Sequence, residues 1–296
     1  MNALSPYQVA LIGSDLSLSL AKVIHERAAR ELGLDAVYRV LDVRDDPSHA
    51  DLSGTLARLQ REGYLGTNIT HPFKKSVIAE LDGLSEDAQA LGAVNTVVFT
   101  DGKRIGHNTD WYGFARSLDT WLGQVDKRTV VQLGAGGAGV AVAHALLRAG
   151  VENLILLGRD PGRTAASADA LLRVHPSATI RADTLDELPG YIGSADGLVN
   201  ATPMGMPAHP GSPVPASLLD ARLWVHEVVY QPLQTELMRQ ARAAGCLTVG
   251  GEHMFVHQAQ ENFRLFTGIQ PSPQRMLAHL KEIVEARAQP APSIAG

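Results

Sequence analysis

The sequence predicts an α/β fold with two domains, and three observations lead to this prediction. Short apolar runs that are typical of buried strands alternate with segments of about ten residues that have helical periodicity. A second series of this kind begins near the middle of the chain, at a glycine-rich loop that lies between a strand and a helix. The chain has 296 residues, which is long enough for two hydrophobic cores.

Predicted strands and helices alternate through the first part of the chain. Strands are expected at 9–13, 36–43, 66–70 and 93–100, and helices at 21–32, 52–61 and 77–84. Because helices separate these strands, we expect a mostly parallel sheet with helices on both faces.

The alternation resumes near residue 111. Helices are expected at 111–122, 140–149, 258–266 and 273–288, and strands at 129–133, 154–157, 197–200, 224–229 and 248–250. This second series predicts a second α/β unit. The last residues, 289–296, are expected to be frayed.

Composition and charge argue against several classes of protein. A formal net charge of -5 and an isoelectric point near 6.1 provide no basic field for a phosphate backbone, so a small-molecule ligand is favoured over nucleic acid. The single cysteine, Cys246, cannot form an intrachain disulfide, and we assign it no function. No leader-like segment and no run approaching about 20 apolar residues is present, so we expect a cytoplasmic protein without a membrane span.

The glycine-rich loop has the pattern of a dinucleotide-binding fingerprint. It consists of Gly134, Ala135, Gly136, Gly137, Ala138 and Gly139. An ordinary glycine-rich turn is the alternative, but the flanking strand and helix favour the fingerprint. The first glycine permits a tight turn, the second lets the backbone approach a pyrophosphate, and the last allows close helix packing. The sequence therefore predicts a Rossmann-type dinucleotide-binding domain, with the pyrophosphate at the helix N-terminus.

The residues after the next strand bear on the choice of dinucleotide. They are Gly158, Arg159, Asp160 and, three positions further on, Arg163. Gly158 stands where NAD-binding folds place an acid for the ribose hydroxyls, whereas Arg159 and Arg163 could bind a 2′-phosphate. We therefore expect NADP, with NAD possible because Asp160 could serve the ribose if the loop bends differently. The alternative for both arginines is a solvated loop.

Three short polar motifs in the first part of the chain each lie at or just beyond the end of a predicted strand. They are Asn68-Ile-Thr-His-Pro-Phe-Lys74, Leu91-Gly-Ala-Val-Asn-Thr96 and Gly106-His-Asn-Thr-Asp110. Taken singly, such residues are more often caps or surface groups. In open α/β sheets ligands bind at the strand ends, so we expect a cleft to which four side chains contribute, namely Thr70, Lys74, Asn95 and Asp110.

Lys74 and Asp110 have the chemistry that a hydride-transfer reaction requires. Reduction of a ketone needs a proton donor at the carbonyl oxygen, and the reverse reaction needs a proton acceptor. A carboxylate beside the lysine orients it and helps to define its charge state. Neutral groups such as Asn95 and Thr70 bind hydroxyls without adding charge, so a pocket lined by them suits an uncharged polyol.

At these motifs the sequence resembles the shikimate dehydrogenase family, including its quinate/shikimate branch. The resemblance runs nearly end to end. Besides the polar motifs and the glycine loop it includes Asn200-Ala-Thr-Pro-Met-Gly-Met206, Val229-Tyr-Gln-Pro232 with Thr235, and Gly251 through Gln258-Ala259 to Thr267-Gly268.

The resemblance implies a set of site residues in a two-domain enzyme. Lys74 and Asp110 would be the catalytic pair, and the substrate would contact Ser19, Thr70, Asn95, Tyr230, Gly251 and Gln258. The cofactor would contact the glycine loop, Arg159, Arg163, and Thr202 and Met204 on the nicotinamide side. Residues 1–111, completed by helices in 252–288, would bind the substrate, and residues 112–251 would form the Rossmann NADP-binding domain. The partner would be a small polyhydroxy ring acid, bound by a monomer or homodimer.

One segment departs from the family pattern. The family has Ser-x-Ser-Pro or Ser-x-Thr-Pro, with His three residues after the proline, to grip the substrate carboxylate. Counting from Gly13 to His25 places Ser19-Leu-Ala-Lys22 on this motif, so Ala21 replaces the second hydroxyl and Lys22 the proline. Ser17 and Ser19 form an alternative pair, and Lys22 is either a replacement cation or an exposed residue.

Several functions follow from these features. The leading one is interconversion of shikimate and 3-dehydroshikimate, and a quinate or aminoshikimate preference is its nearest rival. A non-catalytic sensor of dinucleotide and metabolite is the second class, against which the presence of both Lys74 and Asp110 argues. A zinc alcohol dehydrogenase finds no support, because the histidines are scattered and the chain has one cysteine. We expect no metal.

Overall fold

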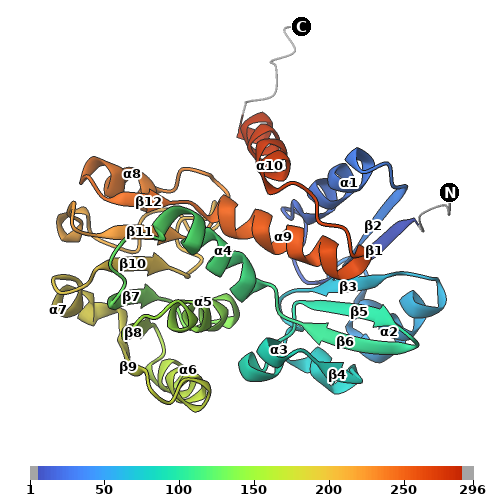
Figure 1. Cartoon of the computed structure of the whole chain (residues 1–296), viewed down its shortest axis with the longest axis horizontal. Helices are drawn as coiled ribbons and strands as arrows, with labels where there is room; N and C mark the ends of the chain where they lie inside the picture. Colours follow the sequence, from blue (N-terminus) through green and yellow to red (C-terminus); the bar gives the residue numbers. More distant parts are fainter. Residues whose placement is uncertain (1–5, 289–296) are drawn as a thin grey trace, which may run out of the picture.

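The computed structural model describes residues 6–288, which form two six-stranded sheets connected by long helices (Figure 1). The frayed tail expected at 289–296 lies outside the described residues. Among residues 6–288, no helix has both the length and the apolar character needed to cross a bilayer. In the same range, no group of three or more His, Cys, Asp or Glu side chains is arranged to hold a metal ion.

The first sheet has the strand order β2-β1-β3-β5-β6-β4. Its strands are β1 (Tyr7–Gly13), β2 (Ala36–Asp42), β3 (Gly66–Ile69), β4 (Gly83–Leu84), β5 (Thr96–Thr100) and β6 (Lys103–His107). The β1–β2, β1–β3 and β4–β6 pairs are parallel, whereas β5 pairs antiparallel with both β3 and β6. Strand β6 was not predicted. It completes a hairpin with β5 whose turn, Asp101-Gly102, has the positive φ angles that such tight turns require.

Helices cover both faces of this sheet. They include α1 (Ala21–Glu31), α2 (Leu52–Arg61) and α3 (Glu86–Leu91), together with the 3₁₀ helices η1 (Pro47–Ala50) and η2 (Ser76–Glu80). The helix predicted at 77–84 was wrong in its second half, because the chain leaves η2 and forms the short strand β4. Apolar residues of α1 pack on one face of the sheet, and those of α2 on the other.

The second sheet is entirely parallel and has the order β12-β11-β10-β7-β8-β9. Its strands are β7 (Thr129–Leu133), β8 (Asn153–Gly158), β9 (Thr179–Thr184), β10 (Gly197–Asn200), β11 (Trp224–Glu227) and β12 (Leu247–Val249). The strand order reverses between β7 and β10. Doubly wound folds bind ligands at the carboxyl ends of the strands on either side of such a switch point.

The helices of the second sheet lie on both of its faces. They are α5 (Gly137–Arg148), α6 (Pro161–Val174), α7 (Leu188–Ile192) and α8 (Glu236–Ala243), with the 3₁₀ helices η3 (Leu185–Glu187) and η4 (Ala216–Leu218). Side chains at their starts cap α6 and α8, where Asp160 accepts from the Arg163 amide and Thr235 accepts from the Met238 amide. Helices α6, α7 and α8 and strand β9 were not predicted.

Helices α4 (Asp110–Leu122) and α9 (Gly251–Thr267) connect the two sheets (Figure 1). They pack along one another, and Gly113 allows the close approach, because a Cβ atom there would lie 2.5 Å from the carbonyl oxygen of Met254. Helix α9 begins seven residues before the predicted start at 258. Phe263 of α9 and Leu280 of α10 (Pro273–Ala288) are buried in the core of the first sheet, so the chain returns to that sheet at its end.

Candidate active site

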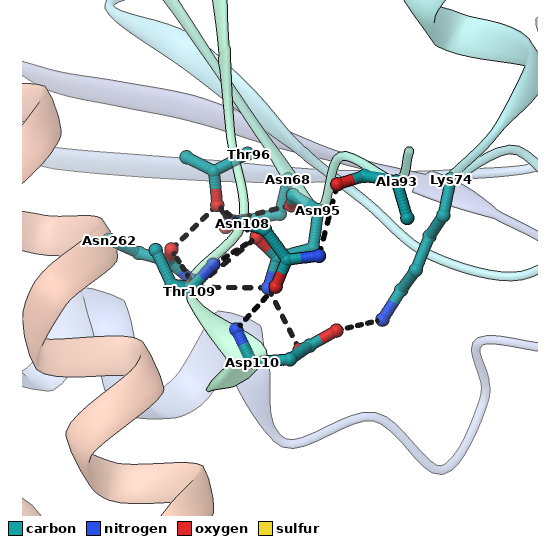
Figure 2. Close-up of polar contacts among 9 residues, drawn as sticks. All are labelled: Asn68, Lys74, Ala93, Asn95, Thr96, Asn108, Thr109, Asp110 and Asn262. Carbon is teal, nitrogen blue, oxygen red and sulfur yellow. Dashed lines mark hydrogen bonds and ion pairs between the residues drawn. The ribbon is translucent and has the colours of Figure 1, made fainter. Parts of the chain in front are cut away.

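Lys74 and Asp110 meet at the edge of the first sheet (Figure 2). The Lys74 ammonium lies 2.6 Å from Oδ2 of Asp110. Lys74 follows β3, whereas Asp110 is the first residue of α4, so the sheet edge brings together residues that are 36 positions apart. The Asp110 side chain is 5% exposed and that of Lys74 is 20% exposed, so water screens this ion pair only partly.

Asparagine side chains fix the orientation of the Asp110 carboxylate. Asn95 Nδ2 donates to Asp110 Oδ1 at 2.9 Å, which leaves Oδ2 directed at Lys74. The second amide hydrogen of Asn95 goes to the Thr109 hydroxyl, also at 2.9 Å. Asn108 Oδ1 accepts from the Asp110 backbone at 3.1 Å, and Asn108 Nδ2 donates to the carbonyl oxygen of Ala93 at 3.0 Å. The carboxylate is therefore held by groups that are themselves bonded.

A further polar layer ties this arrangement to α9. Asn262 Oδ1 accepts from the hydroxyls of Thr96 at 2.6 Å and Thr109 at 2.7 Å. Asn68 Nδ2 in turn donates to Thr96 Oγ1 at 3.2 Å. All of these side chains are buried, so their hydrogen bonds avoid the cost of unpaired polar groups. Asn262 was not identified from the sequence, because only the packing of α9 brings it to this layer.

The glycine loop lies at the switch point of the second sheet. Gly134 follows β7 with a φ of +97°, and a Cβ atom there would lie 2.7 Å from the carbonyl oxygen of Ala201, which follows β10. At Gly136 and Gly137 a Cβ atom would meet nothing within 4 Å, so the backbone in front of α5 is open to a ligand. Gly139 packs against the Gly134 carbonyl, and a side chain would overlap it.

The glycine loop fits a dinucleotide pyrophosphate. Its open backbone precedes the N-terminus of α5, where amide groups without intrahelical partners favour an anion. Gln132, which was not singled out from the sequence, stabilises the loop, because its Nε2 donates to the carbonyl oxygens of Gly134 at 2.8 Å and Gly139 at 2.7 Å. Ala135 and Ala138 are part of the same loop.

At the end of β8, Asp160 has a different role from Arg159 and Arg163. Asp160 Oδ1 accepts from the Arg163 amide at 3.0 Å and thus serves as the N-cap of α6. Arg159 and Arg163 are exposed. This arrangement leaves the guanidinium groups accessible to a phosphate, while the carboxylate is engaged with the protein backbone.

A buried carboxylate supports the loop that carries Thr202 and Met204. Asn200 Oδ1 accepts from the Thr202 amide at 3.0 Å and from its hydroxyl at 2.7 Å, and Asn200 Nδ2 donates to Glu227 Oε1 at 2.9 Å. Burial raises the pKa of Glu227 to about 7. Met204 is exposed at the tip of this loop. Glu227 was not identified from the sequence.

The remaining expected substrate residues lie on several elements. Thr70 follows β3, Tyr230 stacks on Phe255 of α9 with a ring separation of 4.3 Å, and both are half-buried. Gly251 begins α9, where a side chain would overlap the carbonyl oxygen of Val228. Gln258 lies on α9 against Gly113, which is one turn along α4 from Asp110.

The altered segment, Ser19 to Lys22, runs into the first turn of α1. Ser19 is half-buried, and its hydroxyl accepts from the Ala21 amide at 3.3 Å. Lys22 is exposed and lies 3.9 Å from Glu26. His25 is a core residue, because its ring bonds to the Tyr7 hydroxyl at 2.5 Å and burial lowers its pKa to about 3. A neutral, buried His25 is unavailable to a carboxylate. The hollow beside this segment is lined by Asp15, Ser17, Ser19, Lys22, Arg44 and Arg287.

A glycine loop at a sheet switch point, combined with a partly buried lysine–carboxylate pair on a neighbouring α/β sheet, defines a two-domain dehydrogenase fold. Three family models match the chain. The model described as "Shikimate dehydrogenase substrate binding domain" matches residues 11–97, "Shikimate / quinate 5-dehydrogenase" matches 117–209, and "Shikimate 5'-dehydrogenase C-terminal domain" matches 251–281.

Individual relatives agree with these models. A shikimate dehydrogenase (NADP(+)) of Streptomyces avermitilis is 50% identical over 95% of this chain and 97% of its own length. A quinate dehydrogenase from Corynebacterium glutamicum in complex with NAD superposes with a TM-score of 0.90 at 42% identity, covering 94% of this chain and 99% of that one. A shikimate 5-dehydrogenase from Thermus thermophilus in complex with NADP(H) and shikimate gives 0.79 at 34% identity, covering 93% and 98%. The chain belongs to the shikimate dehydrogenase family.

Proposed function

We propose that this protein is an NADP-dependent oxidoreductase that interconverts shikimate and 3-dehydroshikimate. The observation that carries the proposal is the contact of 2.6 Å between the Lys74 ammonium and the Asp110 carboxylate, at a sheet edge lined by neutral polar groups. A sensor without turnover would have no need for a proton donor and acceptor held beside a buried carboxylate. The name of the Streptomyces avermitilis relative and the ligands of the Thermus thermophilus structure support the same activity and cofactor.

We propose the following division of the chain. Residues 1–111, with the helices of 252–288, bind the substrate, and residues 112–251 bind the dinucleotide. The packing of Phe263 and Leu280 in the core of the first sheet supports this division. The glycine loop (Gly134, Ala135, Gly136, Gly137, Ala138 and Gly139) would hold the pyrophosphate, Arg159 and Arg163 the 2′-phosphate, and Thr202 and Met204 would lie beside the nicotinamide.

A bound nicotinamide would supply the hydride chemistry at the substrate carbon that carries the reacting oxygen. Lys74 handles the accompanying proton: its ammonium donates to the ketone oxygen during reduction, and its amine accepts the hydroxyl proton during oxidation. Asp110 orients Lys74 through the contact between its Oδ2 and the ammonium group. The proton count closes, because oxidation of the alcohol releases one proton in addition to the hydride.

The other pocket residues would bind and orient the ring. We propose that Ser19 contacts the carboxylate end, that Thr70 and Gln258 bind ring hydroxyls, and that Tyr230 and Gly251 line the cleft. Asn95 has a further part in this proposal. Because both of its amide hydrogens are donated within the protein, to Thr109 and Asp110, it positions Asp110 as well as lining the pocket. The cytoplasmic location and the monomeric or dimeric state stay predictions.

A second candidate activity is oxidation of quinate with NAD. The TM-score of 0.90 to the quinate dehydrogenase complexed with NAD, together with Ala21 and Lys22 in the carboxylate-binding segment, favours it. Steady-state rates with shikimate, quinate and aminoshikimate, each with NADP and with NAD, separate these activities. We expect the highest kcat/KM for shikimate with NADP. Quinate with NAD as the best pair would contradict the proposal.

A further inference from the structure

The end of β8 leaves no room for a side chain at Gly158. A Cβ atom there would overlap the hydroxyl oxygen of Thr164 and lie 3.3 Å from its Cβ atom. Thr164 belongs to the first turns of α6 and is 1% exposed, so it cannot turn outward into solvent. Gly158 itself is buried between the strand and the helix. The hydroxyl of Thr164 therefore occupies the space into which any residue other than glycine would project.

A hydrogen bond fixes the Thr164 hydroxyl in this position. It donates to the carbonyl oxygen of Asp160 at 2.7 Å, and a β-branched side chain within a helix has few alternative rotamers. The Asp160 carbonyl also accepts from the Thr164 amide at 3.0 Å. Loss of the hydroxyl would thus leave that carbonyl with a partner, so a substitution at 164 opens space without creating an unpaired buried acceptor.

The position blocked by Thr164 is the one that decides between the two dinucleotides. In NAD-binding folds an acid near the end of the second strand accepts hydrogen bonds from the ribose hydroxyls, and it repels a 2′-phosphate. Here Gly158 stands at this point, and the nearby carboxylate of Asp160 is engaged as the cap of α6. The exposed Arg159 and Arg163 remain as the charged groups beside it.

We propose that Thr164 is a cofactor-specificity residue, because its hydroxyl excludes a carboxylate from position 158 and so keeps the site selective for NADP over NAD. This inference rests on the proposed function and deepens it. Thr164 acts here by occupying space next to the ribose site. A change from NADP to NAD preference then requires two substitutions, one at Gly158 and one at Thr164.

The test is a set of variants whose dinucleotide affinity and thermal stability are both measured. The variants are Gly158→Asp, Thr164→Ala, the double variant with both, and a control that combines Gly158→Asp with Thr164→Val. Valine keeps the bulk of threonine without the hydroxyl, so the control separates space from hydrogen bonding. Dissociation constants for NADPH and NADH are measured by fluorescence titration of the full chain, which requires no turnover.

We expect Gly158→Asp alone to lower Tm and to bind NADH no better than the parent chain. The double variant with Thr164→Ala should regain Tm and bind NADH at least about tenfold more tightly than Gly158→Asp alone, as expected for a hydrogen bond to a charged group. The Thr164→Val control should behave like Gly158→Asp alone. Equal gains in NADH affinity with and without Thr164→Ala would overturn the proposal.

A smaller probe covers the case in which Gly158→Asp does not fold. Gly158→Ala introduces only the Cβ atom, and its loss of Tm should be smaller when Thr164→Ala is present. Equal losses in both backgrounds would overturn the inference. If the parent chain binds NADPH and the two losses of Tm are equal, only the proposed role of Thr164 is refuted. If the parent chain binds neither dinucleotide, the proposed function is refuted as well.

Discussion

Asn95 donates a hydrogen bond of 2.9 Å to Oδ1 of Asp110, and this bond directs the other carboxylate oxygen toward Lys74. The amide is buried, and a backbone donor from Thr109 holds its oxygen at 2.8 Å. The geometry of the proton-transferring pair is therefore determined by a neutral side chain that precedes β5. Catalysis should therefore depend on Asn95.

Replacement of Asn95 by alanine should lower kcat. A hydrogen bond to a charged group contributes about 1.5–3 kcal/mol, so we expect kcat for shikimate oxidation to fall by about ten- to a hundredfold. The dissociation constant for NADPH should stay close to that of the parent chain. Asn153→Ala is a matched control. Asn153 is the first residue of β8 in the second sheet, and its side-chain amide donates to the Thr129 hydroxyl at 3.5 Å. A folded Asn95→Ala variant with the parental kcat would contradict this role.

Substitution of Ala21 by serine should strengthen binding of the substrate carboxylate. Ala21 stands where the family has its second hydroxyl, at the start of α1 and two residues after Ser19. One neutral hydrogen bond contributes about 0.5–1.5 kcal/mol, so KM for shikimate should fall by about two- to tenfold at constant kcat. Ala166→Ser on the exposed side of α6 serves as the control. An unchanged or higher KM in Ala21→Ser would show that the carboxylate binds elsewhere.

Ionisation of Glu227 should make the protein less stable as the pH rises. Burial raises the pKa of this carboxyl from 4.5 to about 7, so the unfolded chain releases the proton at lower pH than the folded chain. The free energy of unfolding should therefore fall between about pH 4.5 and about pH 7, by an amount of the order of 3 kcal/mol.

Urea titrations of the parent chain and of Glu227→Gln over this pH range measure the effect. The difference between their unfolding free energies isolates the contribution of Glu227 from that of the buried histidines. The exposed Glu62→Gln provides a control that should follow the parent chain. If the free energies of unfolding of the parent chain and of Glu227→Gln changed with pH in parallel, the raised pKa of Glu227 would be refuted.

Local patterns in the sequence predicted the parts of the site that depend on local structure. The glycine loop was predicted because a strand, a glycine-rich segment and a helix occupy adjacent positions. The proximity of Lys74 and Asp110 was predicted because polar motifs near strand ends meet at one edge of a sheet. The strand that directly precedes Asp110, β6, was not itself predicted. In the structure their charged groups are 2.6 Å apart.

The features that were not predicted depend on tertiary packing or on weak local signals. Asn262 reaches the polar layer of Thr96 across 166 positions, which no local pattern indicates. Strand β6, Lys103–His107, carries one large apolar residue, Ile105, so its periodicity is weak. The Asp101-Gly102 pair was the available signal for the hairpin and for the antiparallel pairing of β5.

The most direct test of the central claim is the Lys74→Ala variant, compared with Lys75→Ala at the exposed neighbouring position. Positioned proton transfer contributes about a hundred- to ten-thousandfold to a rate, so Lys74→Ala should lose at least about a hundredfold in kcat for shikimate oxidation. Its dissociation constant for NADPH should match that of Lys75→Ala. Parental turnover by folded Lys74→Ala would contradict the account.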